Sequence, residues 1–227
     1  MKTILCYGDS NTYGYDPRDG SRYDHTVRWP AVMAKMLNAG ASPEAPSPGG
    51  GPRPENGLFW VVEEGLNGRT TCLEDPIEGD KNGLRQLIPI LRSHRPLDLV
   101  IVMLGSNDLK RRFNPTPYDI SHGAQLVAKA ILASETGPQD GKPTVLMVCP
   151  PPLIESPAFR QILDPGAVEL SHKLSPCYAA CARECGAAFF DAGSVVTSSP
   201  ADGLHWEAEG HLAFAQAMAG QVRKLLG

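Results

Sequence analysis

The chain alternates between short apolar runs and longer amphipathic stretches. Five runs are rich in β-branched and aromatic residues, and each stops at a glycine, a proline or a charged residue, which is typical of buried strands. They lie at about residues 2–7, 59–63, 98–104, 144–149 and 187–190. The third run is apolar on both faces, as expected of a central strand in a parallel sheet.

The stretches between these runs favour helices. We expect them at about residues 28–37, 83–93, 117–134, 164–185 and 207–226. The last carries an apolar stripe at helical spacing, made of Leu212, Phe214, Ala215, Met218, Val222 and Leu225. Strands that alternate with helices predict an α/β fold, with a five-stranded parallel sheet covered on both faces by right-handed crossovers. Trp29, near the start of the first helix, is interpreted as a core residue in preference to a wall of a substrate pocket.

Length and composition fit one domain. A chain of 227 residues is long enough for one well-cored α/β domain, so residues 1–227 are treated as a single unit. Residues 39–57 are dense in proline and glycine, which excludes a strand ladder or a helix and predicts a surface insertion. Such an insertion caps a substrate cleft, forms a subunit contact or is simply tolerated.

Charge and cysteine usage exclude several classes of protein. A net charge of −4 gives no basic footprint, so nucleic acid is not an expected partner. No apolar run approaches the roughly 20 residues of a membrane span. The first run leads directly into Gly8-Asp9-Ser10, and no signal peptide is expected there. The six cysteines lack the spacing of a disulfide scaffold, which favours the reducing cytoplasm.

The candidate chemistry lies where the runs end. Ser10 follows the first run, at the end of a strand where open α/β sheets bind ligands. A serine hydroxyl becomes an effective nucleophile when a base takes its proton, and His205 is the candidate base. Asp202 lies three residues earlier and would orient the imidazole. His211 competes for the role of base, but it lies inside the last helix with no acid three residues before it.

Four separated blocks resemble those of the GDSL/SGNH hydrolase family. They are Gly8-Asp9-Ser10, Gly65-Leu66-Asn67-Gly68-Arg69-Thr70-Thr71, Gly105-Ser106-Asn107-Asp108 and Asp202-Gly203-Leu204-His205. They occur in the family's order and frame nearly the whole chain, although Asn11 stands where the family name has leucine. The second and third blocks look most like the arylesterase and acyltransferase branch, which also contains carbohydrate acetylesterases.

The resemblance implies a fold and a set of site residues. The fold would be a flavodoxin-like three-layer α/β/α sandwich with strand order 2-1-3-4-5. The catalytic residues would be Ser10, Asp202 and His205. The oxyanion hole would use the backbone N–H groups of Ser10 and Gly68 and the side-chain amide of Asn107. Gly68 matches the family better than Gly65, and its missing Cβ lets the backbone approach a substrate.

The predicted function is a serine esterase. It would remove acetyl or other short acyl groups from aryl, alkyl or sugar esters through an acyl-enzyme on Ser10, and acyl transfer to an alcohol is a related activity. We expect a small-molecule ester as substrate and no metal or organic cofactor. By analogy with the branch alone, we also expect a homo-oligomer.

Two other functions stay open. A lysophospholipase or thioesterase acting on longer acyl chains would use the same residues; it is less favoured because the sequence has no membrane-facing amphipathic segment. A non-catalytic flavodoxin-like module would bind an anion or a nucleotide, but neither Gly-x-Gly-x-x-Gly nor a Gly-Lys-Ser/Thr loop is present.

Two further clusters have a simpler structural interpretation. The charged run before Phe113, from Lys110 to Arg112, is typical of a solvated turn, with contact to an acidic substrate as the alternative. Cys177, Cys181 and Cys185 recur every four residues on one helical face. Packing of small residues is favoured there over a metal cluster with His172, because the spacing is not that of a zinc site.

Overall fold

The fold is built around one parallel sheet. The computed structural model describes residues 1–39, 58–158 and 162–227, so the insertion predicted at 39–57 lies, apart from residue 39, outside the described residues. The strands are β1 (Lys2–Gly8), β2 (Phe59–Gly65), β3 (Leu99–Met103), β4 (Thr144–Cys149) and β5 (Ala188–Asp191). They are all parallel, in the order β2-β1-β3-β4-β5. The predicted flavodoxin-like topology is confirmed.

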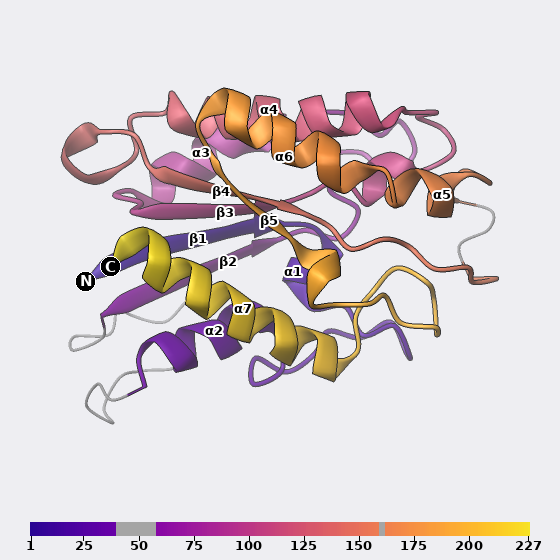
Figure 1. Cartoon of the computed structure of the whole chain (residues 1–227), viewed down its shortest axis with the longest axis horizontal. Coiled ribbons are helices and arrows are strands. Elements are labelled where there is room, and N and C mark those ends of the chain that lie inside the picture. The colour runs from indigo at the N-terminus through magenta and orange to yellow at the C-terminus, as the bar shows by residue number, and fades with distance from the viewer. Residues whose placement is uncertain (40–57, 159–161) are drawn as a thin grey trace.

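Helices cover both faces of the sheet (Figure 1). One layer holds α2 (Trp29–Leu37) and α7 (Ala208–Leu226), and the other holds α3 (Gly83–His94), α4 (Pro117–Leu132) and α6 (Leu174–Cys185). Shorter elements are α1 (Ser10–Tyr13), α5 (Ala167–Ser171) and the 3-10 helices η1 (Asn107–Leu109), η2 (Pro138–Asp140) and η3 (Ala192–Ser194). Among the described helices, none has the length and apolar character needed to cross a bilayer.

Each face of the sheet has its own apolar core. Between the sheet and the α2–α7 layer, Trp29 meets Phe214 edge to face with ring centroids 4.9 Å apart. Trp206 packs on the same phenyl ring, at 5.0 Å. All three side chains are buried, so Trp29 is a core residue, as predicted. Buried aromatic side chains of this size contribute strongly to the stability of the α2–α7 layer.

The register of the strands aligns the ends that carry polar residues. Gly8, the last residue of β1, lies opposite Gly65 of β2 and opposite Met103 of β3. The segments that follow these three strands therefore leave the sheet at the same edge, where open α/β sheets bind ligands.

The sequence prediction was wrong for the helix expected at about residues 164–185. The structure has two helices there, α5 and α6, which are separated by His172 and Lys173. Pro176 explains the break, because a proline has no N–H to donate and its ring clashes with the carbonyl four residues earlier. Pro176 is tolerated because it falls in the first turn of α6, where N–H groups have no partner inside the helix.

The segment that begins at Ser10 forms the four-residue helix α1, which is not among the helices predicted from the sequence. Asp9 caps this helix, since its Oδ1 accepts a hydrogen bond from the backbone N–H of Asn11 at 3.0 Å. Gly14 ends it in the left-handed conformation, with φ of 87°. A single turn of helix is too short to show a periodic pattern in the sequence.

A methyl group at Gly65 is expected to disrupt the contact between β2 and α1. A Cβ there would lie 2.1 Å from the backbone nitrogen of Tyr13, and backbone atoms cannot turn aside as a side chain can. Gly65→Ala should therefore lower the free energy of unfolding by about 1–3 kcal/mol in urea denaturation. Gly220→Ala is the control, because Gly220 lies in α7 with no atom near its absent Cβ; it should raise stability by about 0.5–1 kcal/mol. Equal effects of the two substitutions would contradict the steric argument.

Candidate active site

Ser10 stands at the junction of β1 and α1. As the first residue of α1, it has a backbone N–H that points out of the helix end instead of pairing within it. The residue is 5% exposed. The strand end and the helix start thus hold both the hydroxyl and the backbone N–H of Ser10 at the edge of the sheet.

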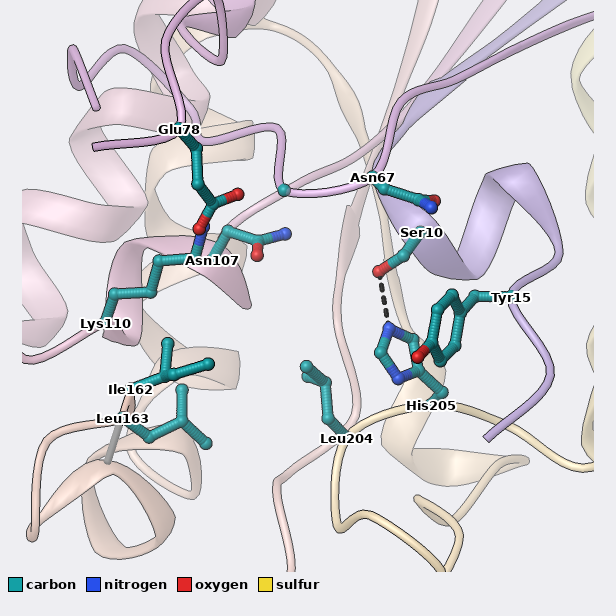
Figure 2. Close-up of a pocket in the computed structure, with 11 residues that line it drawn as sticks. Ser10, Tyr15, Asn67, Glu78, Asn107, Lys110, Ile162, Leu163, Leu204 and His205 are labelled. Atoms are coloured by element: carbon teal, nitrogen blue, oxygen red, sulfur yellow. Dashed lines mark hydrogen bonds and ion pairs between the residues drawn. The ribbon is translucent and has the colours of Figure 1, made fainter. Parts of the chain in front are cut away.

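His205 and Asp202 complete a chain of hydrogen bonds with Ser10. The Ser10 Oγ lies 2.7 Å from His205 Nε2 (Figure 2). On the other side of the ring, His205 Nδ1 lies 2.6 Å from Asp202 Oδ2. An ionised carboxylate can only accept, so Nδ1 carries the proton, and Nε2 is left to accept the hydrogen bond from the serine hydroxyl. The structure therefore brings together the three residues that the sequence indicated as nucleophile, base and acid.

Backbone contacts fix the loop that carries Asp202 and His205. Asp202 Oδ1 accepts hydrogen bonds from the backbone N–H groups of Leu204 and His205, each at 2.9 Å. The carbonyl of Gly203 accepts from the N–H of Ile154, in the segment that follows β4. Asn11, the departure from the family name, donates from Nδ2 to the carbonyl of Leu204 at 3.4 Å. The short helix with the serine is thereby joined directly to the loop with the base.

Gly68 and Asn107 face the same pocket as Ser10 and His205. Gly68 has φ of 81°, a conformation that favours glycine. Gly65 instead lies against α1 and is not part of the lining. Asn107 is the first residue of η1, and within the described residues its buried Nδ2 has no hydrogen-bond partner. A buried amide without a partner costs free energy, and a hydrogen bond to a ligand in the pocket would recover that cost.

The pocket has one polar wall and one apolar wall (Figure 2). Its lining also includes residues that the sequence did not indicate: Tyr15, Asn67, Glu78, Ile162, Leu163 and Leu204. The pocket is small, with a volume of about 160 Å³. The ring of Tyr15 lies 4.2 Å from the imidazole of His205, measured between ring centroids. The only signal for these residues was their position in the polar stretch after Ser10, in the second block, or in loops that follow strands.

Asp108 ties the second block to the third. Its carboxylate accepts hydrogen bonds from the backbone N–H of Thr71 at 3.0 Å and from the Thr71 hydroxyl at 2.5 Å. Arg69 acts in a similar way, since Nη1 donates to the carbonyls of Gly8 and Glu64. Asp108 and Arg69 therefore brace the loops around the pocket.

Burial and hydrogen bonding set the electrostatics of the site. Burial raises the pKa of Asp9 to about 6, although the Asn11 N–H and His205 work against this shift. Burial likewise raises the pKa of Asp108 to about 6, against its hydrogen bonds from Thr71. For Asp202, burial also favours the neutral acid, but the hydrogen bonds from His205 and Leu204 outweigh it, and the net effect is a pKa below the ordinary value. Asp202 therefore stays ionised beside the imidazole.

His211 does not reach the pocket. It is fully buried in α7, packed against the rings of Trp206 and Tyr23. Burial lowers its pKa to about 3, so the imidazole stays neutral. His205, and not His211, lies at the serine.

The structure agrees with the simple structural interpretation for the cysteines but not for the whole charged run that begins at Lys110. The run from Lys110 to Arg112 is not a solvated turn throughout, because Lys110 is buried and lines the pocket. Its ammonium group is paired with carboxylates, so it is not free to bind an acidic substrate. The cysteines are free thiols, and Cys181 is buried on the packing face of α6. Within residues 1–39, 58–158 and 162–227, no three His, Cys, Asp or Glu side chains gather as a metal site would require.

The chain belongs to the GDSL-like lipase/acylhydrolase family, whose model matches residues 6–213. It is a serine ester hydrolase of this family. A comparison with curated protein sequences gives no match.

Several solved structures are similar over the full length of both chains. A carbohydrate acetylesterase from Sinorhizobium meliloti is 36% identical, with a TM-score of 0.87 and complete coverage of each chain. The aryl esterase of M. smegmatis is 38% identical, with a TM-score of 0.86 and complete coverage. A putative arylesterase from Agrobacterium tumefaciens str. C58 is 37% identical, with a TM-score of 0.84 and complete coverage. The resemblance to the arylesterase and acetylesterase branch is therefore confirmed.

Removing the charge of Asp9 is expected to change how stability depends on pH. Because folding raises the pKa of Asp9 from 3.8 to about 6, the folded protein holds this proton to higher pH than the unfolded chain, and stability falls as pH rises through that window. Asn keeps a carbonyl oxygen for the cap but does not ionise. Asp9→Asn should therefore gain stability relative to wild type between pH 4 and pH 7, by about 1–3 kcal/mol. Urea denaturation at several pH values measures this difference, and parallel curves for the two proteins would contradict it.

Proposed function

We propose that Ser10, His205 and Asp202 are the catalytic residues of an esterase that cleaves short-chain acyl esters through an acyl-enzyme. The observation that supports this most directly is the continuous chain of hydrogen bonds from Ser10 through His205 to Asp202, which opens on a pocket with an unpartnered amide. Nucleophile, base and orienting acid are each within hydrogen-bonding distance of the next, as nucleophilic catalysis requires.

The first half of the reaction forms the acyl-enzyme. His205 Nε2 takes the proton from the Ser10 hydroxyl as Oγ attacks the ester carbonyl. Asp202 holds Nδ1–H and stabilises the imidazolium that results. The protonated His205 then gives its proton to the departing alcohol, and the acyl group stays on Oγ. In the second half, His205 takes a proton from water as the water oxygen attacks the acyl-enzyme. The bond from the acyl carbon to Oγ then breaks, the acid leaves, and the protonated His205 returns its proton to Oγ.

The carbonyl oxygen becomes negative in both halves and needs donors. The Ser10 N–H projects from the N-terminal end of α1, and the Asn107 amide lies buried in the pocket without a partner in the described chain. Gly68 supplies a backbone N–H from a turn without a Cβ, which lets a substrate approach closely. Donors that are fixed before reaction stabilise the developing charge without reorganising, and this is often the largest catalytic effect in acyl transfer.

The size of the pocket supports a small acyl group. About 160 Å³ is well below the roughly 300–1,000 Å³ typical of pockets for drug-sized ligands. The similar structures are of enzymes described as carbohydrate acetylesterase and aryl esterase. We therefore propose acetyl and other short acyl esters of aryl, alkyl or sugar alcohols as substrates. Acyl transfer to an alcohol, a homo-oligomeric state and a cytoplasmic location stay predictions.

Hydrolysis of p-nitrophenyl esters from acetate to decanoate tests this proposal. The acetate should be cleaved fastest, because longer chains exceed the pocket, and Ser10→Ala should lose turnover on every ester while keeping its fold by circular dichroism. Its residual rate should fall by at least about 10⁴-fold, as expected when a nucleophile is removed. A preference for decanoate would favour the lysophospholipase or thioesterase alternative. Turnover that survives in Ser10→Ala would overturn the assignment of the nucleophile.

Asn107→Ala is expected to separate transition-state stabilisation from binding. Loss of one oxyanion donor should lower kcat by about 10²–10³-fold. KM should change little, since the neutral carbonyl of the bound ester makes a weaker hydrogen bond than the oxyanion does. Steady-state kinetics on p-nitrophenyl acetate measure both constants. A rise in KM with kcat unchanged would remove Asn107 from the oxyanion hole.

A further inference from the structure

Four charged side chains form a closed cluster beside the pocket; we call Asp75, Glu78, Lys110 and Arg112 the charge cluster. The two carboxylates come from the segment between the second block and α3, and the two cations follow η1. Lys110 Nζ lies 2.5 Å from Glu78 Oε1 and 3.3 Å from Asp75 Oδ2. Arg112 Nη2 lies 2.6 Å and 2.5 Å from the same two oxygens.

The charge cluster is electrically balanced and partly buried. The side chain of Asp75 is fully buried and that of Lys110 is 6% exposed, so neither charge is screened by direct contact with water. Burial by itself would raise the pKa of Asp75, but its hydrogen bonds from Arg112 and from backbone N–H groups outweigh burial and hold the pKa well below the ordinary value. Asp75 therefore stays ionised. The charge cluster sets two carboxylates against two cations, so removing any one charge leaves an excess of the other sign.

Glu78 brings one carboxylate oxygen against the backbone of Gly68. While Oε1 accepts from both cations, Oε2 stands 2.5 Å from the point where a Cβ of Gly68 would lie. Glu78 and Lys110 both line the pocket, next to Asn107 (Figure 2). A negative charge is thus placed beside the two groups proposed to hold the oxyanion.

Such a charge would oppose the reaction if it were not neutralised. The oxyanion and the carboxylate have the same sign, and in a partly desolvated site their repulsion is much stronger than in water. Lys110 follows Asn107 by three residues and places its ammonium directly on Glu78, on the pocket side of the charge cluster.

We propose that Lys110 is a positioning residue that neutralises Glu78 beside the oxyanion hole, so that the developing negative charge meets a balanced cluster. Lys110 acts through Glu78 and need not touch the substrate. The proposal rests on the function proposed above, because it requires an oxyanion at Gly68 and Asn107. It goes beyond that function because it makes the rate of the reaction depend on Lys110 and Glu78. This charge pair lies outside the four sequence blocks.

Neutralising the two charges, singly and together, tests the proposal. Lys110→Met leaves an excess negative charge and should lower kcat on p-nitrophenyl acetate by roughly 10–100-fold with little change in KM. Glu78→Gln leaves an excess positive charge beside the oxyanion, which attracts it, so kcat should rise above the wild-type value. The double variant Lys110→Met/Glu78→Gln keeps the 2.5 Å pair of Asp75 with Arg112 and restores neutrality, so kcat should return to within about threefold of wild type.

Arg112→Met is the matched control. It removes the same charge from the charge cluster, but Arg112 is not among the residues that line the pocket. Its kcat should fall clearly less than that of Lys110→Met. Thermal unfolding of all variants shows whether each is folded at the assay temperature. Should Lys110→Met not fold, Glu78→Gln and the double variant decide the question by themselves.

Inhibition by benzeneboronic acid supplies a second readout, because it forms a negative tetrahedral adduct on an active-site serine. Its Ki should rise in Lys110→Met by about the factor by which kcat falls, and it should recover in the double variant. The proposal is overturned if Glu78→Gln loses as much activity as Lys110→Met, or if the double variant is as slow as Lys110→Met. A wild-type protein without Ser10-dependent turnover or boronate inhibition would instead overturn the proposed function itself.

Discussion

The parallel register of β1 with β2 and β3 is the constraint on which the site depends. Gly8 lies opposite both Gly65 and Met103, so three segments that are far apart in the sequence leave the sheet side by side. Ser10, Gly68 and Asn107 each follow one of these strands within a few residues. A shift of one residue in any pairing would turn the strand's side chains to the other face and carry its block away from the others. The register of the strands therefore determines which loops meet at the pocket.

Much of this arrangement could be predicted because it depends on local patterns. Apolar runs mark the strands, and Ser10 and Asn107 stand directly after two of them. The family resemblance supplied Gly68 and the strand order. What could not be predicted depends on contacts between loops. Tyr15 packs on His205, with the two rings tilted, and Glu78 packs on Gly68, only because the chain folds back in three dimensions.

Two sequence predictions about single helices were wrong for local reasons. The expected helix at residues 164–185 is broken because Pro176 cannot donate a backbone hydrogen bond, although the apolar pattern continues through the break. The turn of helix at Ser10 was not predicted because four residues are too few to show a period. Its cap, Asp9, is recognised only from the hydrogen bond that the Asn11 N–H donates to its carboxylate. Lys110 illustrates a third limit, since a charged run looks like a surface turn unless its partners, Asp75 and Glu78, are known.

The pair formed by Ser10 and His205 joins positions 195 residues apart. Because a chain is made from its N-terminus, Ser10 is synthesised well before His205. Trp206, the residue after His205, packs on Phe214 of α7 in the core. A nascent chain without His205 therefore has no imidazole beside the Ser10 hydroxyl. On the mechanism proposed above, such a partly made copy would lack the base that Ser10 needs to attack an ester.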